Sequence, residues 1–252
     1  MSSSRALVFA RSLFLQAGFG DERRQALGFA WALDPVLSEA YANDSRGLAE
    51  ARTRHFGSFN TNPYAAGLIL GVTASLERRI AAGEESLRGR VSVLKSSAGA
   101  SLAGAADAFF WGALRPLAAA SAVLIATTLF ILRQPHPFFW GSVVGLAIFN
   151  IPALVARWKG LSRGLAEGEG ALAAAALLPV QKWIYLTRVA AGGVMIAAAA
   201  LASSSGVIVH PLWSAGAFLA GVVFSAHAGG PLKLVAGAGL VGAAAAAGGW
   251  RL

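Results

Sequence analysis

The sequence predicts an all-α, polytopic membrane protein, with N-terminal amphipathic or interfacial helices, re-entrant or broken helices and about five transmembrane helices. Its composition is the first reason. Of 252 residues, 56% are hydrophobic and only 13% are charged, and the mean hydropathy is +0.60. Soluble domains carry about 25% charged residues. The second reason is the uncharged stretch between Arg188 and Lys233, which is long enough for two spans of about 20 residues and a turn.

Two regions are indicated by the distribution of polar residues. Residues 1–95 mix polar and apolar positions and are predicted to form amphipathic and re-entrant helices, at the membrane interface or packed on a partner subunit. The apolar positions that indicate this are Leu7, Phe9, Leu13, Phe14, Phe29, Trp31 and Leu33. Residues 96–252 are predicted to form the transmembrane helical bundle.

Uncharged runs place the five spans, and the charges between them orient the chain. The predicted spans are 116–132, 138–156, 186–204, 212–229 and 232–250. Thirteen Lys and Arg residues lie at or before Arg115, one lies in the next loop, five lie from Arg157 to Arg188, and none lies in the 203–211 turn. Because basic loops stay in the cytoplasm, the N-terminus is expected inside and the C-terminus outside.

Several kinds of chemistry have no support in the sequence. The chain has no cysteine, which excludes disulfides, Cys-ligated metals and a thiol nucleophile. The four histidines lack the spacing of metal ligands, and neither a Ser-His-Asp set nor a phosphate-binding glycine loop is present. The net charge of +9 comes from basic residues beside apolar runs. We therefore expect no cofactor, metal, catalytic residue or nucleic-acid partner.

The first candidate for function is the polar segment that leads into a short apolar run. Asn60 and Asn62 lie in it, and Pro63 is well suited to the first position of a helix. The run Tyr64–Leu76 has 13 residues and ends at the charged residues from Glu77 onward. It is too short to cross a bilayer and suits a re-entrant half-helix, of the kind from which transporters build sites at the membrane midplane. An ordinary N-cap on an interfacial helix is the alternative.

The second candidate is an acidic residue inside an apolar, aromatic stretch. Asp107 is the only carboxylate between Glu85 and Glu167, and an ionisable group within a membrane segment is a functional hypothesis by default. Trp111 falls one helical turn later, and Arg115 one turn after that. A carboxylate and an aromatic ring suit a neutral sugar. A structural Asp107–Arg115 pair is the alternative.

The third candidate is Asn150, which lies two residues before Pro152 inside a predicted span. A helix kink or a packing role is favoured over contact with a ligand.

Together these segments resemble the IID subunit of the mannose/fructose/sorbose family of phosphotransferase system (PTS) sugar transporters. The resemblance is collinear over nearly the whole chain, and it is carried by Arg11–Ala17, Glu22–Gln25, Gly28–Leu33, His55-Phe56, Phe59–Tyr64, Ile69–Glu77, Asp107–Pro116, Phe149–Pro152 and Gly229–Lys233.

The resemblance implies a subunit of a sugar permease in the bacterial inner membrane. A IIC membrane partner and IID form the pathway for a hexose-type sugar, and cytoplasmic IIA and IIB phosphocarriers phosphorylate it. Several IIC–IID pairs are expected to assemble. Asn60, Asn62, Asp107 and Trp111 are the expected substrate-binding residues, while Pro63, Arg115 and Asn150 are assigned structural or pairing roles.

Two departures from the family pattern keep a second reading open. The chain has Gly104-Ala105-Ala106 before the aspartate, where the family often has Gly-x-Gly, and Asn62 where many relatives carry His. The alternative is a degenerate family member that acts as a membrane scaffold or regulatory partner without transport.

Five spans with the N-terminus inside can be tested by reporter fusions. Fusions at Gly206 and at Leu252 are both expected to report the outer side of the membrane, because the loop charges alternate along the chain. A cytoplasmic signal at either position contradicts this topology.

Overall fold

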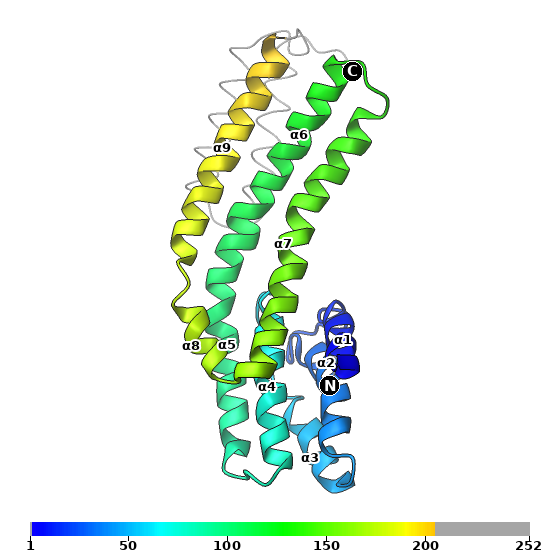
Figure 1. The fold of residues 1–252 in the computed structure, drawn as a ribbon, viewed down its shortest axis with the longest axis vertical. Coiled ribbons are helices and arrows are strands. Elements are labelled where there is room, and N and C mark those ends of the chain that lie inside the picture. The colour runs from blue at the N-terminus through cyan, green and yellow to red at the C-terminus, as the bar shows by residue number, and fades with distance from the viewer. Residues whose placement is uncertain (1, 205–252) are drawn as a thin grey trace. The chain divides into compact units, whose positions relative to one another are not determined.

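The computed structural model describes residues 2–204, which fold into helices (Figure 1). Their contacts divide the chain into two compact units: Met1–Pro116 with Ala147–Arg188, and Leu117–Leu146 with Val189–Leu252. The helices are α1 (Ser2–Ser12), α2 (Ala26–Ala40), α3 (Ser45–Arg54), α4 (Ala66–Ala81), α5 (Leu87–Phe109), the π-helical turn η1 (Phe110–Leu114), α6 (Arg115–Ile131), α7 (Pro137–Glu167), α8 (Gly170–Ala176) and α9 (Val180–Ser204).

Among the described residues, three segments are long and apolar enough to cross a membrane: Leu87–Ile131, Pro137–Glu167 and Val180–Ala202. They contain the predicted spans 116–132, 138–156 and 186–204, apart from a few terminal residues. The first is longer than predicted because α5 continues through η1 into α6. The predicted spans 212–229 and 232–250 lie outside the described residues.

The predicted amphipathic region, residues 1–95, forms the helices α1 to α4 and the start of α5. Within it, Phe29 and Leu33 are fully buried, whereas Leu13, Phe14 and Trp31 are exposed. The predicted boundary between residues 95 and 96 falls inside α5, so the two-region division stays a prediction from sequence. The run after Tyr64 lies mostly in α4, which is buried among the protein's own helices, and its depth in a membrane also stays a prediction.

Glycines allow α4 to contact α7 closely. Gly67 and Gly71 on α4 are spaced four residues apart, as are Gly160 and Gly164 on α7, and Gly71 lies against Gly164. A Cβ at Gly67 would lie 2.1 Å from the backbone carbonyl oxygen of Arg157. Small residues at this spacing let helix backbones approach each other. The two helices therefore pack backbone to backbone.

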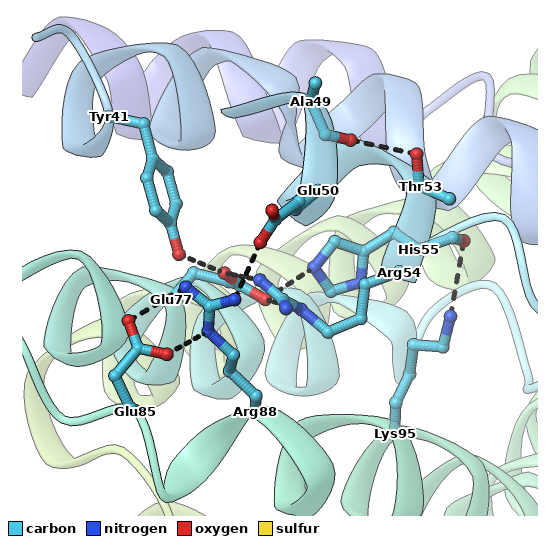
Figure 2. A network of polar contacts seen from close by, with 10 residues as sticks. All are labelled: Tyr41, Ala49, Glu50, Thr53, Arg54, His55, Glu77, Glu85, Arg88 and Lys95. Atoms are coloured by element: carbon cyan, nitrogen blue, oxygen red, sulfur yellow. Dashed lines mark hydrogen bonds and ion pairs between the residues drawn. The ribbon is translucent and has the colours of Figure 1, made fainter. Parts of the chain in front are cut away.

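A second set of contacts to α4 is polar: a hydrogen-bond network around a buried carboxylate, shown in Figure 2. Glu77 of α4 is fully buried. It accepts hydrogen bonds from the Tyr41 hydroxyl (2.9 Å), from two nitrogens of Arg54 (3.0 Å each) and from His55 Nε2 (3.0 Å). From the sequence, Glu77 is expected only as the charged end of an apolar run. In the structure it joins the ends of α2 and α3 to α4.

Lys95 extends the network to α5. Its ammonium group donates to the backbone carbonyls of His55 (3.3 Å) and Gly57 (3.4 Å), just after the end of α3. It also lies over the rings of Phe29 (5.4 Å) and Phe59 (5.8 Å). A cation is favourable at a helix C-terminus and over aromatic faces. Lys95 thus holds the chain as it leaves α3.

Burial and charge set the protonation states in this network. Burial acts to raise the pKa of Glu77, but the hydrogen bonds from His55 and Arg54, together with the charge of Arg54, outweigh it and lower that pKa from 4.5 to about 2. Burial lowers the pKa of His55 below its ordinary 6.5, against the opposite effect of Glu77. A neutral His55 donates from Nε2, which is consistent with an Nδ1 that has no hydrogen-bond partner among the described residues.

Replacing Gly67 by Ala is expected to destabilise the fold. The added Cβ meets a backbone carbonyl, which cannot rotate away, and overpacking of this kind costs about 1–3 kcal/mol or more. Gly89→Ala is the matched control, because nothing lies within 4 Å of a Cβ there. Thermal unfolding of the detergent-solubilised protein measures both, and equal unfolding temperatures would contradict the close contact.

The free energy of unfolding is expected to fall as the pH drops from about 7 to 5. The folded pKa of His55 lies below the unfolded value of 6.5, so the unfolded chain binds a proton that the folded chain does not. Glu77 adds a further loss below its unfolded value of 4.5. His55→Gln should flatten the slope between about pH 7 and 5 in thermal unfolding, and an unchanged slope would contradict this account.

Candidate functional site

The segment before α4 is held in place by Gln25, which is buried. The Gln25 side-chain amide donates to the backbone carbonyl of Thr61 (2.8 Å) and accepts from the Thr61 N–H (3.0 Å). The Gln25 backbone N–H also donates to the carbonyl of Phe59 (2.8 Å). These three hydrogen bonds fix the backbone immediately before Asn62.

Asn62 joins the two segments that the sequence singled out. Its side chain is buried, and its Oδ1 accepts from the Tyr64 N–H (2.9 Å), as in an Asx turn. Its Nδ2 donates to Asp107 Oδ1 (2.8 Å). The Asn62 and Asp107 segments therefore meet. Pro63 lies in a turn, and α4 begins at Ala66 rather than at the predicted first helical position, Pro63.

Beyond Asp107 the helix changes its geometry. The π-helical turn Phe110–Leu114 lets the Arg115 N–H bond to the carbonyl of Phe110, five residues back. An extra residue in a turn rotates the helix after the turn relative to the helix before it. In the described chain, Asp107 bonds to Asn62 rather than pairing with Arg115. The guanidinium carbon of Arg115 lies 6.0 Å from the centre of the Trp111 ring.

An aromatic cluster adjoins the Asn62–Asp107 hydrogen bond. The ring of Trp111 stacks on Phe149 (5.7 Å between centres, 25° between planes). Tyr64 lies 5.5 Å from both rings and 4.9 Å from Phe110. Trp111 remains 40% exposed. Part of the Trp111 side chain thus remains accessible beside the Asn62–Asp107 pair.

A buried arginine supports this cluster from α7. From the sequence, Arg157 is expected only as a loop cation, yet it is buried. Its Nη1 donates to the carbonyl of Ser12 (3.0 Å), at the end of α1, and its guanidinium lies 5.5 Å from the Tyr64 ring centre. The signal in the sequence is its helical spacing from Ala153 and Leu161, which are both buried.

The remaining candidates lie around this pair. Asn60 is exposed, next to the Thr61 backbone that Gln25 holds. Asn150 is exposed on α7, directly after Phe149 of the aromatic cluster, and α7 continues through Pro152. Within residues 2–204, no group of three His, Asp or Glu side chains is arranged to hold a metal ion.

Comparison with known proteins identifies the family. Residues 2–211 match the PTS system mannose/fructose/sorbose family IID component. The mannose-specific IID component of Escherichia coli is 35% identical over 161 residues, which are 64% of this chain and 54% of the relative. The sorbose-specific component of Klebsiella pneumoniae is 35% identical over 161 residues, or 64% and 56% of the two chains. The fructose permease IID component of Bacillus subtilis is 31% identical over 166 residues, or 64% and 55%.

The matched part of the chain thus spans about half the length of these curated relatives. Two solved structures are similar over 99% of this chain and 97% of theirs, at 26% identity. One is the mannose transporter ManYZ in complex with a microcin (TM-score 0.59), and the other is described as a membrane protein (TM-score 0.70). The chain belongs to the mannose/fructose/sorbose family of PTS IID components.

Proposed function

We propose that this chain is the membrane-embedded IID subunit of a PTS permease, which translocates a hexose-type sugar together with a IIC partner. Phosphorylation of the sugar by cytoplasmic IIA and IIB phosphocarriers is coupled to this movement. The observation that carries the proposal is the hydrogen bond between Asn62 and Asp107, beside the exposed ring of Trp111. Membership of the family supports it.

The chemistry of this pair suits a neutral, hydroxyl-rich ligand. Asn62 is buried and held by two hydrogen bonds, whereas Asp107 is exposed. A carboxylate has four acceptor sites in its two oxygens, so Asp107 retains acceptors for sugar hydroxyls. The ring of Trp111 provides an apolar face for the C–H surface of a sugar, and Asn60 lies close by in sequence.

The same pairing meets a requirement of the membrane. A polar group left without a partner in hydrocarbon costs several kcal/mol. Asn62 lies in the non-helical segment just before α4, and Asp107 lies near the end of α5, just before the π-helical turn η1. Transporters build substrate sites from polar groups at the starts and irregular turns of membrane helices.

The setting that we propose is the bacterial inner membrane, with the N-terminus in the cytoplasm and several IIC–IID pairs in each assembly. The alternation of basic loops supports this orientation. The large apolar side chains exposed on α1 and α2 support contact with the bilayer or with the IIC partner.

Substitution of the central pair should reduce sugar uptake without preventing assembly. Asp107→Asn removes the charge, and Asn62→Leu removes the polar group. A hydrogen bond to a charged group is worth about 1.5–3 kcal/mol, so uptake at low sugar concentration should fall by about tenfold or more. Uptake of radiolabelled mannose in cells, normalised to assembled complex, is the measurement.

Two variants serve as matched controls. Asp21→Asn removes an exposed carboxylate, and Asn43→Leu removes an exposed amide; neither residue lies near the Asn62 segment in sequence. Both controls are expected to keep normal uptake. Unchanged uptake in both site variants would remove this pair from the sugar path. A wild-type chain that assembles with its partner but moves no sugar would favour the scaffold reading.

A further inference from the structure

The π-helical turn has a backbone carbonyl whose ordinary partner is missing. In an α-helix the carbonyl of Gly112 accepts from the N–H four residues later, and that residue is Pro116, which has no N–H. The ring of a proline also clashes with the carbonyl of the residue four positions before it. A local π-helical adjustment such as the turn at Phe110–Leu114 is a recognised way for a membrane helix to accommodate a proline.

A side chain from another helix supplies a donor to this carbonyl. Arg188 of α9 donates from Nε to the Gly112 carbonyl oxygen at 3.1 Å. Its Nη2 lies 3.0 Å from the position that a Cβ would take on Gly112, so the guanidinium lies directly against the turn. Arginines inside membrane segments are costly and pair with acids or backbone carbonyls. Arg188 lies in the segment Val180–Ala202.

The turn that Arg188 contacts contains Trp111, a residue of the candidate site. Trp111 immediately precedes Gly112, and its ring is stacked on Phe149. The backbone carbonyl of Asp107 lies 3.8 Å from the same Cβ position on Gly112. A change in the geometry of η1 therefore moves Trp111 relative to the Asp107 carboxylate.

We propose that Arg188 is a positioning residue: it takes the place of the N–H that Pro116 lacks, holds the π-helical turn and thereby sets Trp111 beside the Asn62–Asp107 pair. The role of that pair in sugar binding rests on the proposed function, whereas the anchoring of the turn does not. Arg188 itself makes no contact with the sugar in this proposal.

Arg188→Met tests the anchor, because it keeps an apolar stem and removes every donor. Hydrogen–deuterium exchange of the purified full chain is read at the peptides covering residues 108–118. Exchange there should accelerate in Arg188→Met and remain nearly as in the wild type in Arg188→Lys, which keeps one donor group. Lys182→Met is the control, since it removes an exposed cation from the same helix and should leave exchange unchanged.

A second substitution distinguishes the loss of this one hydrogen-bond donor from a general destabilisation of the helices. Pro116→Ala restores a backbone N–H at the position that the Gly112 carbonyl lacks. In the Arg188→Met background it should recover most of the protection from exchange. Faster exchange that Pro116→Ala does not recover would contradict the proposed replacement of one donor by the other.

Transport distinguishes positioning from a merely structural role. Mannose uptake by assembled complexes carrying Arg188→Met should show a KM raised by about tenfold with a smaller change in maximal rate, because the sugar-facing ring is misplaced. Faster exchange with an unchanged KM would reduce Arg188 to a structural residue, and unchanged exchange would overturn the anchor. A wild-type chain without uptake would count against the proposed function, and exchange would then decide the anchor alone.

Discussion

The packing of the N-terminal helices depends on the hydrogen bonds that the buried carboxylate of Glu77 accepts. An ionised carboxylate inside a protein costs several kcal/mol unless its charge is compensated. Four hydrogen bonds from Tyr41, Arg54 and His55 compensate it here. Removing any of these donors would leave part of the carboxylate charge uncompensated, so the ends of α2 and α3 are held against the C-terminal half of α4. The network around Glu77 therefore fixes the point at which the chain leaves α3.

Further hydrogen bonds hold the backbone between the end of α3 and the candidate site. Lys95 binds the carbonyls that come after α3, and Gln25 binds the backbone of Phe59 and Thr61. Asn62 follows Thr61 in the chain, and its side chain donates a hydrogen bond to Asp107. On the other side, the glycine contact between α4 and α7 brings Arg157 beneath the Tyr64 ring. The polar pair and the aromatic cluster are thus held from two directions.

Two carboxylates of this chain differ in burial and in the number of hydrogen bonds that they accept. Glu77 is fully buried and its oxygens are occupied by donors, which leaves no acceptor for a ligand. Asp107 is exposed and is joined to Asn62 through Oδ1. A group that binds a passing substrate must keep hydrogen-bonding capacity in reserve, and a group that holds helices together must not. The burial of Glu77 therefore suits a structural group, and the exposure of Asp107 suits the sugar-binding role that we propose for it.

The sequence by itself determined the membrane class and the first three candidate spans, and it singled out Asn62 and Asp107, which the structure joins by a hydrogen bond. Hydropathy is a local property, and a polar residue within an apolar run is visible without knowing its partner. The tertiary structure decided which polar residues are buried and with whom. Glu77 read as the end of a helix and Arg157 as a loop cation, because periodicity describes one helix at a time. Their partners, such as Tyr41 and Ser12, lie 36 and 145 residues away in the chain, and only packing brings such distant residues together.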